Sequence, residues 1–171
     1  EIMDELHINK CDVIGASMGG WISMNFAIYS PDKVDHLILL GPMGIKANTF
    51  GVMRRLFKVL FFPSQKNKEA LTKWCLGDNQ SVNDEMAEYM NTAMNCDGRL
   101  PIPKRIKKNQ LKIIHAKTFL ILGEYDNPIG KPLKNSKFAK RNIQIIKTKT
   151  VGTGHLMSME NPELINSLII D

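Results

Sequence analysis

Apolar and polar residues alternate along the chain in blocks whose lengths suit strands and helices. A short apolar run at residues 11–16 leads directly into an apolar-rich stretch at 17–30, which Pro31 ends. That stretch is apolar nearly all round, so we expect a helix packed on several sides. A second, unbroken apolar run follows at 36–40. Strands apolar on both faces that alternate with helices predict an α/β fold with a parallel sheet.

The pattern changes between residues 43 and 108, where apolar residues recur at helical spacing. Four of them share one helix face at positions i, i+3, i+4 and i+7: Met53, Leu56, Phe57 and Leu60. A second helical face lies at 70–75, and Ser81-x-x-Asp84 resembles the capping box of a third helix. A helical insertion after a strand, in place of a simple crossover helix, indicates a lid, or cap.

Two further strands are predicted after this insertion. Residues 118–122 form another buried apolar run, and residues 143–147 follow a lysine-rich helix at 133–141. Asn161 then suits the N-cap of a last helix, with Pro162 at its first position. This order predicts one α/β core in which all four strands share a sheet.

The predicted core comprises residues 1–42 and 109–171, with the helical cap at 43–108 inserted between its strands. A chain of 171 residues with 43% hydrophobic and 23% charged residues suits a globular protein. No apolar run approaches the ~20 residues of a membrane span, and nothing at the start resembles a signal peptide. We therefore expect a cytoplasmic protein that binds no membrane.

The cysteine spacing argues against a metal site, and the distribution of charge argues against a nucleic-acid-binding site. Cys11, Cys75 and Cys96 show no C-x-x-C or Cys/His metal spacing, so we expect free thiols and no metal. The net charge is +6, and two runs lack acidic residues: 99–112 carries six Lys/Arg, and 131–149 carries seven. Nucleic-acid binding is one interpretation of such runs. A solvated basic face is favoured, because no interleaved aromatic residues or known binding motif accompany them.

Candidate chemistry begins at Gly15-Ala16-Ser17-Met18-Gly19, between the first predicted strand and its helix. A sharp turn here forces the serine into a strained backbone conformation and starts the helix close to the strand. The residues two before and two after the serine must then be nearly free of side chain, as Gly15 and Gly19 are. The turn holds a hydroxyl at a helix N-terminus, where partial positive charge favours a developing oxyanion.

Ser17 alone is a weak nucleophile, because its proton needs a base and that base needs an orienting acid. Asp126 lies four residues after the third predicted strand, and His155 lies in a Gly-rich loop after the fourth. The carboxyl ends of parallel strands share the edge where ligands bind, so these residues can converge. Glu124 competes with Asp126 for the role of the acid. Structural roles are expected for the other histidines: His7, His36 and His115.

These motifs resemble those of the α/β-hydrolase family, and together with the cap they look most like its bacterial carboxylesterases. Residues 15–19 fit the nucleophile elbow G-x-S-x-G of that family. Residues 122–126, Leu-Gly-Glu-Tyr-Asp, look like its acid-bearing turn, and residues 152–155, Gly-Thr-Gly-His, look like its histidine loop. The segment 155–163 also resembles the family's sequence after the histidine, and the order Ser, Asp, His is the one the family uses.

The resemblance implies that Ser17 is the nucleophile, His155 the general base and acid, and Asp126 the orienting carboxylate. It makes the N–H of Met18 one oxyanion donor. The implied function is a serine hydrolase that acts on a carboxylic ester with a small or medium apolar acyl group, through an acyl-enzyme and without metal or cofactor. Some apolar cap residues would then line an acyl pocket. Acyltransferase, thioesterase, C–C hydrolase and cofactor-free haloperoxidase activities share the same triad and stay open.

The family's sheet has more strands than the four predicted here. The resemblance implies that the strands before the nucleophile strand, and a loop that supplies a second oxyanion donor, lie outside these residues. The chain is then a fragment of a longer enzyme or a short form of it. A short form would expose the strand at 11–16 as an apolar edge, for which pairing into a homodimer is expected. A catalytically weak remnant that serves as an associating or binding domain is therefore the alternative.

Overall fold

The computed structural model describes residues 2–46, 49–76, 92 and 103–170. By their contacts the residues group into two compact units. The sheet unit comprises residues 1–46, 103–122 and 133–150. The cap unit comprises residues 47–102, 123–132 and 151–171. The division into a core and a cap at 43–108 stays a prediction.

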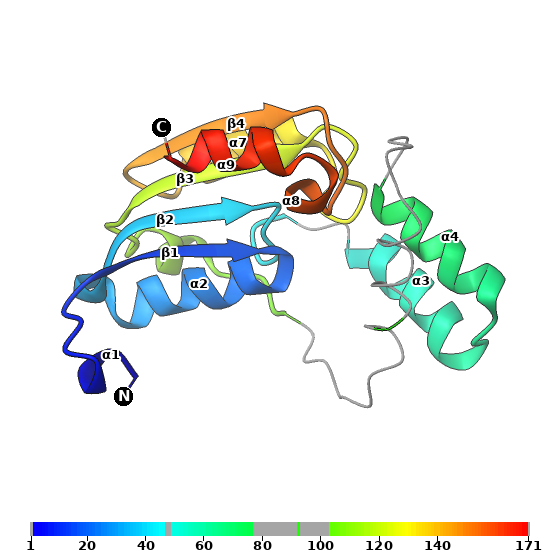
Figure 1. Ribbon diagram of the computed structural model, residues 1–171, viewed down its shortest axis with the longest axis horizontal. Helices are drawn as coiled ribbons and strands as arrows, with labels where there is room; N and C mark the ends of the chain where they lie inside the picture. The colour runs from blue at the N-terminus through cyan, green and yellow to red at the C-terminus, as the bar shows by residue number, and fades with distance from the viewer. Residues whose placement is uncertain (1, 47–48, 77–91, 93–102, 171) are drawn as a thin grey trace. The chain divides into compact units, whose positions relative to one another are not determined.

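Four strands form one sheet in the order in which they occur along the chain (Figure 1). They are β1 (Cys11–Ala16), β2 (Val34–Leu40), β3 (Lys117–Gly123) and β4 (Ile146–Val151). β1 pairs in parallel with β2, and β2 pairs in parallel with β3. The register places Ala16 opposite Leu40 and Leu40 opposite Ile121. Ser17, which directly follows β1, therefore lies at the edge of the sheet where the carboxyl ends of the strands meet.

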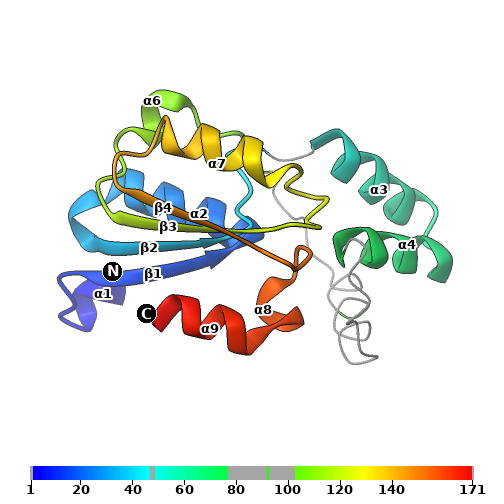
Figure 2. The same cartoon turned by 90° about the horizontal axis from the view of Figure 1, so that it is seen from above.

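Helices α2 (Ser17–Tyr29) and α7 (Pro132–Lys140) lie on the same side of this sheet (Figure 2). The described side chains of α2 are buried or half-buried except at Ile22 and Tyr29, which are 55% and 76% exposed. The predicted packing on several sides is thus confirmed for most of the helix. Three short turns of helix complete the unit: α1 (Ile2–Glu5), η1 (Pro31–Lys33) and α6 (Lys108–Leu111).

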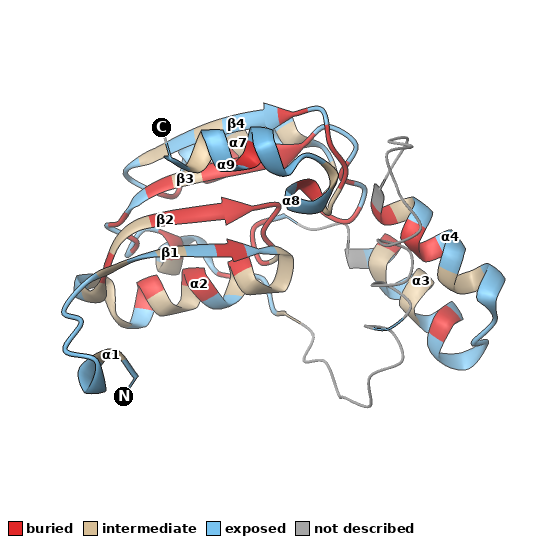
Figure 3. Ribbon diagram, viewed as in Figure 1, coloured by how far each residue is buried: buried red, intermediate tan, exposed pale blue. Residues whose placement is uncertain are grey.

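The core of the sheet unit lies along β2 and β3 (Figure 3). Large side chains at 0% exposure come from these strands, from α2, and from α6 and the segment that follows it: Met24, Leu37, Leu39, Leu111, Ile114, Leu120 and Ile121. β1 and β4 instead alternate between exposed and half-buried residues over most of their length. The central strands therefore carry unbroken apolar runs, while the outer strands need apolar residues only at every second position.

In the cap unit, α3 (Thr49–Phe61) and α4 (Gln65–Leu76) pack against each other. Val59, Leu71 and Cys75 form the buried centre of this pair, flanked by Leu56 and Trp74. The short helix α8 (Met157–Glu160) contacts α9 (Pro162–Ile170) in the same unit. Both helices predicted between Met53 and residue 75 are confirmed, whereas the predicted capping box at residues 81–84 lies outside the described residues.

The predicted α/β fold, with a parallel sheet and flanking helices, is confirmed, and β1 has the predicted limits. The fourth strand is a correction, because β4 begins at Ile146 and not at Ile143. The N–H of Ile143 donates to the carbonyl of Ala139 at 2.9 Å, so this residue continues the turn that ends α7. The predicted N-cap of the last helix is confirmed, since Oδ1 of Asn161 accepts the N–H of Leu164 at 3.1 Å.

Among the described helices, none combines the length and the apolar character that crossing a membrane requires.

Candidate active site

Ser17 occupies the turn between β1 and α2, and its backbone lies in the left-handed region with φ of 50°. Non-glycine residues adopt this conformation rarely, and the surrounding structure must hold them there. The carbonyl of Ser17 accepts the N–H of Met43 at 2.9 Å, which ties the turn to the loop after β2. The turn thus has the strained geometry that the elbow motif predicts.

Two glycines allow this turn to close. A Cβ atom on Gly15 would lie 2.3 Å from the hydroxyl oxygen of Ser23 and 2.5 Å from the carbonyl oxygen of Gly19. A Cβ atom on Gly20 would lie 2.6 Å from the Cβ of Pro42. At Gly19 a Cβ atom would meet nothing within 4 Å outside its own stretch of helix. The expectation that Gly19 must lack a side chain is therefore wrong, and Gly20 has this role instead.

The start of α2 leaves its first turn without a side-chain cap. Ala16 is the N-cap residue and makes no side-chain hydrogen bond. Met18, which is half-buried, lies in this first turn. Backbone N–H groups of a first helical turn have no acceptor within the helix and carry partial positive charge. The turn can therefore donate to an anion that develops beside Ser17, as expected for the N–H of Met18.

Asp126 and His155 contact each other in the cap unit. Both carboxylate oxygens of Asp126 lie 3.0 Å from Nδ1 of His155. The side chain of Asp126 is 1% exposed, and that of His155 is 9% exposed. Oδ1 of Asp126 also accepts the N–H of Ile129 at 2.9 Å. A buried carboxylate at Nδ1 holds the proton on that nitrogen, so Nε2 is the nitrogen that can accept a proton from a nucleophile.

The acid turn and the histidine loop pack backbone against backbone. The N–H of Tyr125 donates to the carbonyl of Thr153 at 3.0 Å. A Cβ atom on Gly123 would lie 2.4 Å from the carbonyl oxygen of Gly154 and 2.5 Å from that of Thr153. The absence of a side chain at Gly123 therefore sets how closely the loop that carries His155 can approach the turn that carries Asp126.

The last carbonyls of α4 hold both loops in place. Nδ2 of Asn127 donates to the carbonyl of Trp74 at 3.0 Å, and the N–H of His155 donates to the carbonyl of Cys75 at 2.9 Å. Burial raises the pKa of the Cys75 thiol to about 12, and the Asp126 carboxylate adds to the shift. The thiol beside the acid and the histidine is therefore held in its neutral form.

The structure places Asp126, and not Glu124, against His155, while Glu124 is exposed. Ser17 and Met18 belong to the sheet unit, whereas Asp126 and His155 belong to the cap unit. The catalytic roles of these four residues stay predictions. Cys11 and Cys75 are free thiols as expected, and Cys96 lies outside the described residues.

Sequence patterns missed the two contacts at Gly20 and Gly123. Gly20 directly follows the elbow motif at 15–19, and Gly123 lies inside the acid-bearing turn at 122–126. A glycine at such a place is a weak signal that another stretch of backbone comes close to it. The atoms that a side chain would meet belong to Pro42 and to the loop at 153–154, which are distant in sequence. No local pattern identifies such neighbours.

One described group could offer three ligand atoms to a metal: Asp12, Asp35 and His36, whose candidate atoms lie within 4.8 Å of one another. Nδ1 of His36 lies 2.7 Å from Oδ1 of Asp12. Nζ of Lys10 lies 3.2 Å from Oδ1 of Asp35. These partly exposed groups are thus paired with one another and with a cation, as in an ordinary ion-pair cluster. The structural role expected for His36 is consistent with this pairing.

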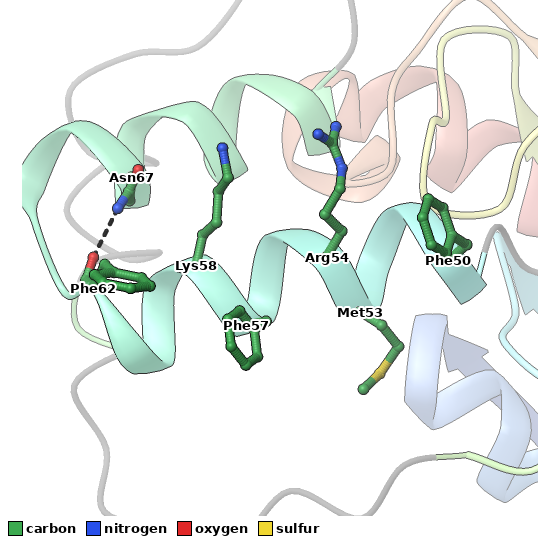
Figure 4. Close-up of a pocket in the computed structure, with 7 residues that line it drawn as sticks. All are labelled: Phe50, Met53, Arg54, Phe57, Lys58, Phe62 and Asn67. Carbon is green, nitrogen blue, oxygen red and sulfur yellow. Dashed lines mark hydrogen bonds between the residues drawn. The ribbon is translucent and has the colours of Figure 1, made fainter.

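The cap unit also carries an apolar groove of about 760 Å³ along α3 (Figure 4). Seven residues line it: Phe50, Met53, Arg54, Phe57, Lys58, Phe62 and Asn67. Phe57 stacks on Phe61 with 4.4 Å between ring centroids, and Nδ2 of Asn67 donates to the carbonyl of Phe62 at 2.7 Å. Four of the seven lining residues are apolar residues of the predicted cap: Phe50, Met53, Phe57 and Phe62.

Comparison with known proteins identifies the family of this chain. Residues 1–151 match the family described as serine aminopeptidase, S33. The chain belongs to this family of α/β-hydrolases. It is 28% identical over 151 residues to the 2-hydroxy-6-oxo-6-phenylhexa-2,4-dienoate hydrolase of Comamonas testosteroni. The matched region covers 78% of this chain and 53% of that protein.

This hydrolase-family chain is also 24% identical over 184 residues to an uncharacterised carboxylesterase of Bacillus subtilis, covering 99% of this chain and 59% of that protein. The crystal structure of naproxen esterase (carboxylesterase NP) from Bacillus subtilis shares the fold with a TM-score of 0.85. That match has 22% sequence identity and covers 99% of this chain and 61% of the other. The chain thus spans between half and two thirds of the length of these relatives.

Proposed function

We propose that this chain belongs to a serine hydrolase that cleaves carboxylic esters with Ser17, His155 and Asp126. The observation that carries the proposal is the buried Asp126 carboxylate, both of whose oxygens lie 3.0 Å from Nδ1 of His155. A buried acid bonded to a histidine in this way supplies what the orienting half of a nucleophilic triad requires. The strained turn at Ser17, at the carboxyl edge of the sheet, supports the other half.

In the proposed reaction, Oγ of Ser17 attacks the carbonyl carbon of the ester while Nε2 of His155 takes the hydroxyl proton. The negative charge moves to the carbonyl oxygen, where the N–H of Met18 donates a hydrogen bond. Collapse of this intermediate breaks the bond to the alcohol oxygen, which receives the proton from His155 and leaves. Water then attacks the acyl-enzyme with the same proton transfers, which releases the acid and restores Ser17.

Asp126 stabilises the imidazolium that forms in both halves of this reaction. Its carboxylate is 1% exposed, so the charge interaction with the ring is little screened by water. The hydrogen bond from the N–H of Ile129 keeps the carboxylate in place without neutralising it. The apolar groove of the cap supports the further proposal that the acyl part of the ester is apolar.

Hydrolysis of a carbon–carbon bond is the second candidate, which is favoured by the similarity to a 2-hydroxy-6-oxo-6-phenylhexa-2,4-dienoate hydrolase. An assay of the full chain separates the two. p-Nitrophenyl acetate, butyrate and hexanoate are compared with a 2-hydroxy-6-oxo-dienoate, and kcat/KM is measured for each. Ester cleavage that rises from acetate to hexanoate supports the proposal, whereas cleavage of the dienoate alone favours the second candidate.

The same assay tests the role of the acid. Asp126→Asn presents an amide to Nδ1 and favours the wrong tautomer, so kcat should fall by about 10⁴. Glu124→Gln is the matched control, because Glu124 lies in the same turn and is exposed. If Asp126→Asn keeps the turnover of Glu124→Gln, the proposed triad is wrong.

A further inference from the structure

The carboxylate of Glu160 accepts backbone hydrogen bonds from the residues on both sides of His155. Glu160 is the last residue of α8 and lies five positions after the histidine. Its Oε2 accepts the N–H of Gly154 at 2.7 Å, and its Oε1 accepts the N–H of Leu156 at 3.0 Å. One side chain therefore holds the backbone on both sides of the proposed base.

The N–H between these two is also fixed. The N–H of His155 donates to the carbonyl of Cys75 at 2.9 Å, so three consecutive backbone N–H groups have acceptors in fixed positions. Two of the three donate to the charged oxygens of Glu160, and charge-assisted hydrogen bonds of this kind are stronger than neutral ones. The backbone conformation of a residue sets the direction of its Cα–Cβ bond and its allowed rotamers. Holding residues 154–156 thus sets where the imidazole of His155 points.

We propose that Glu160 is a positioning residue for the histidine base. The proposal rests on the function proposed above. Asp126 fixes the ring through Nδ1, and Glu160 fixes the backbone from which the ring projects, so the direction of Nε2 is determined from two sides. A small error in that direction matters, because a displacement on the order of 1 Å at a reacting group costs about 10²-fold in rate.

Glu160→Gln in the full chain tests the proposal. A glutamine side chain has one acceptor oxygen, so one of the two backbone N–H groups would face an amide NH₂ group. We expect kcat to fall by about 10- to 10²-fold with little change in KM, because substrate binding does not depend on the proton transfer. Glu163→Gln is the matched control: it removes the same charge at an exposed position three residues further on.

Three measurements accompany the kinetics. They are the rate at which a fluorophosphonate labels Ser17, the melting temperature, and the low-field proton resonance of Nδ1 of His155. Glu160→Gln should slow labelling and shift or broaden that resonance, while Glu163→Gln should change neither. Glu160→Ala serves as a second variant that removes both acceptors without placing a donor in the loop, and it should slow labelling at least as much.

The outcomes separate this inference from the function on which it rests. If the unmodified chain is not labelled at Ser17, the proposed function is wrong. If the chain is labelled and Glu160→Gln matches Glu163→Gln in kcat and in the resonance, the role of Glu160 is wrong and the function stands. A loss of melting temperature with unchanged kcat would likewise overturn it, because Glu160 would then only stabilise the fold.

Discussion

Replacing Gly123 with alanine tests whether the contact between the acid turn and the histidine loop controls activity. The added Cβ atom would lie 2.4 Å from the carbonyl oxygen of Gly154 and 2.5 Å from that of Thr153. Real Cβ contacts essentially never fall below 3.0 Å, so the shorter one must lengthen by at least 3.0 − 2.4 = 0.6 Å. Both obstacles are backbone atoms, and neither can move aside as the end of a flexible side chain would.

The displacement acts on both stability and turnover. Overpacking of this size costs about 1–3 kcal/mol, which lowers the melting temperature by several degrees. The histidine loop moves away from the turn that carries Asp126, so the two hydrogen bonds from Nδ1 of His155 lengthen. We expect kcat/KM for p-nitrophenyl butyrate to fall roughly 10- to 10²-fold, since about 1 Å at a reacting group costs about 10².

Gly152→Ala provides the control for this variant. Gly152 lies in the same loop, and a Cβ atom there would meet nothing within 4 Å. The kcat/KM of both variants is measured at a temperature where both remain folded. Their melting temperatures are measured separately, by circular dichroism during heating. Equal activity of Gly123→Ala and Gly152→Ala would show that the close approach of the two backbones has no effect on the paired acid and histidine, contrary to this prediction.

Further predictions concern the elbow, the Cys75 thiol and the edge of β1. Gly20→Ala should cut activity and stability more than Gly19→Ala, because only the former meets Pro42, and equal effects in activity and melting curves would contradict this. Iodoacetamide at pH 8 should modify Cys11 while sparing Cys75, whose pKa of about 12 leaves a thiolate fraction on the order of 10⁻⁴. Between pH 9 and 12 the thiol of Cys75 keeps its proton in the folded protein and loses it in the unfolded chain, so the free energy of unfolding should decrease as the pH rises through this range. Rapid modification of Cys75 in the native protein would contradict both the expected protection and the expected pH dependence. Residues 1–171 expressed alone should associate through the edge of β1, where Ile14 is 53% exposed, and a sharp monomer boundary in sedimentation would rule that out.

The sequence predicted β1 and the start of α2 well because the elbow motif leaves little freedom. A glycine two residues before the serine and a helix directly after it are required by the turn itself, and Ser17 indeed has φ of 50°. The partner of His155 could also be chosen in advance, because the family places the acid at the later position of the turn. Asp126 is the residue found there, with its carboxylate buried.

The errors concern elements whose position depends on distant neighbours. β4 lies at an outer position of the sheet and carries exposed Lys147 and Lys149, so it lacks the apolar run that marks a central strand. The stronger apolar signal at Ile143 belongs to the turn that ends α7. Which glycine of the elbow meets another segment depends on where Pro42 lies, and the contacts of Gly123 depend on the path of the histidine loop. Packing between segments that are distant in sequence decides where β4 begins and which glycines contact another segment. The local sequence pattern carries no information about that packing.

We propose Ser17 as the nucleophile that His155 and Asp126 activate. The most direct test is covalent labelling of the full chain by a fluorophosphonate, followed by mass spectrometry of the labelled peptide. We expect one labelled residue, Ser17, with labelling abolished in Ser17→Ala and slowed by several orders of magnitude in His155→Ala. Labelling that persists in Ser17→Ala, or that proceeds at an unchanged rate without His155, would contradict it.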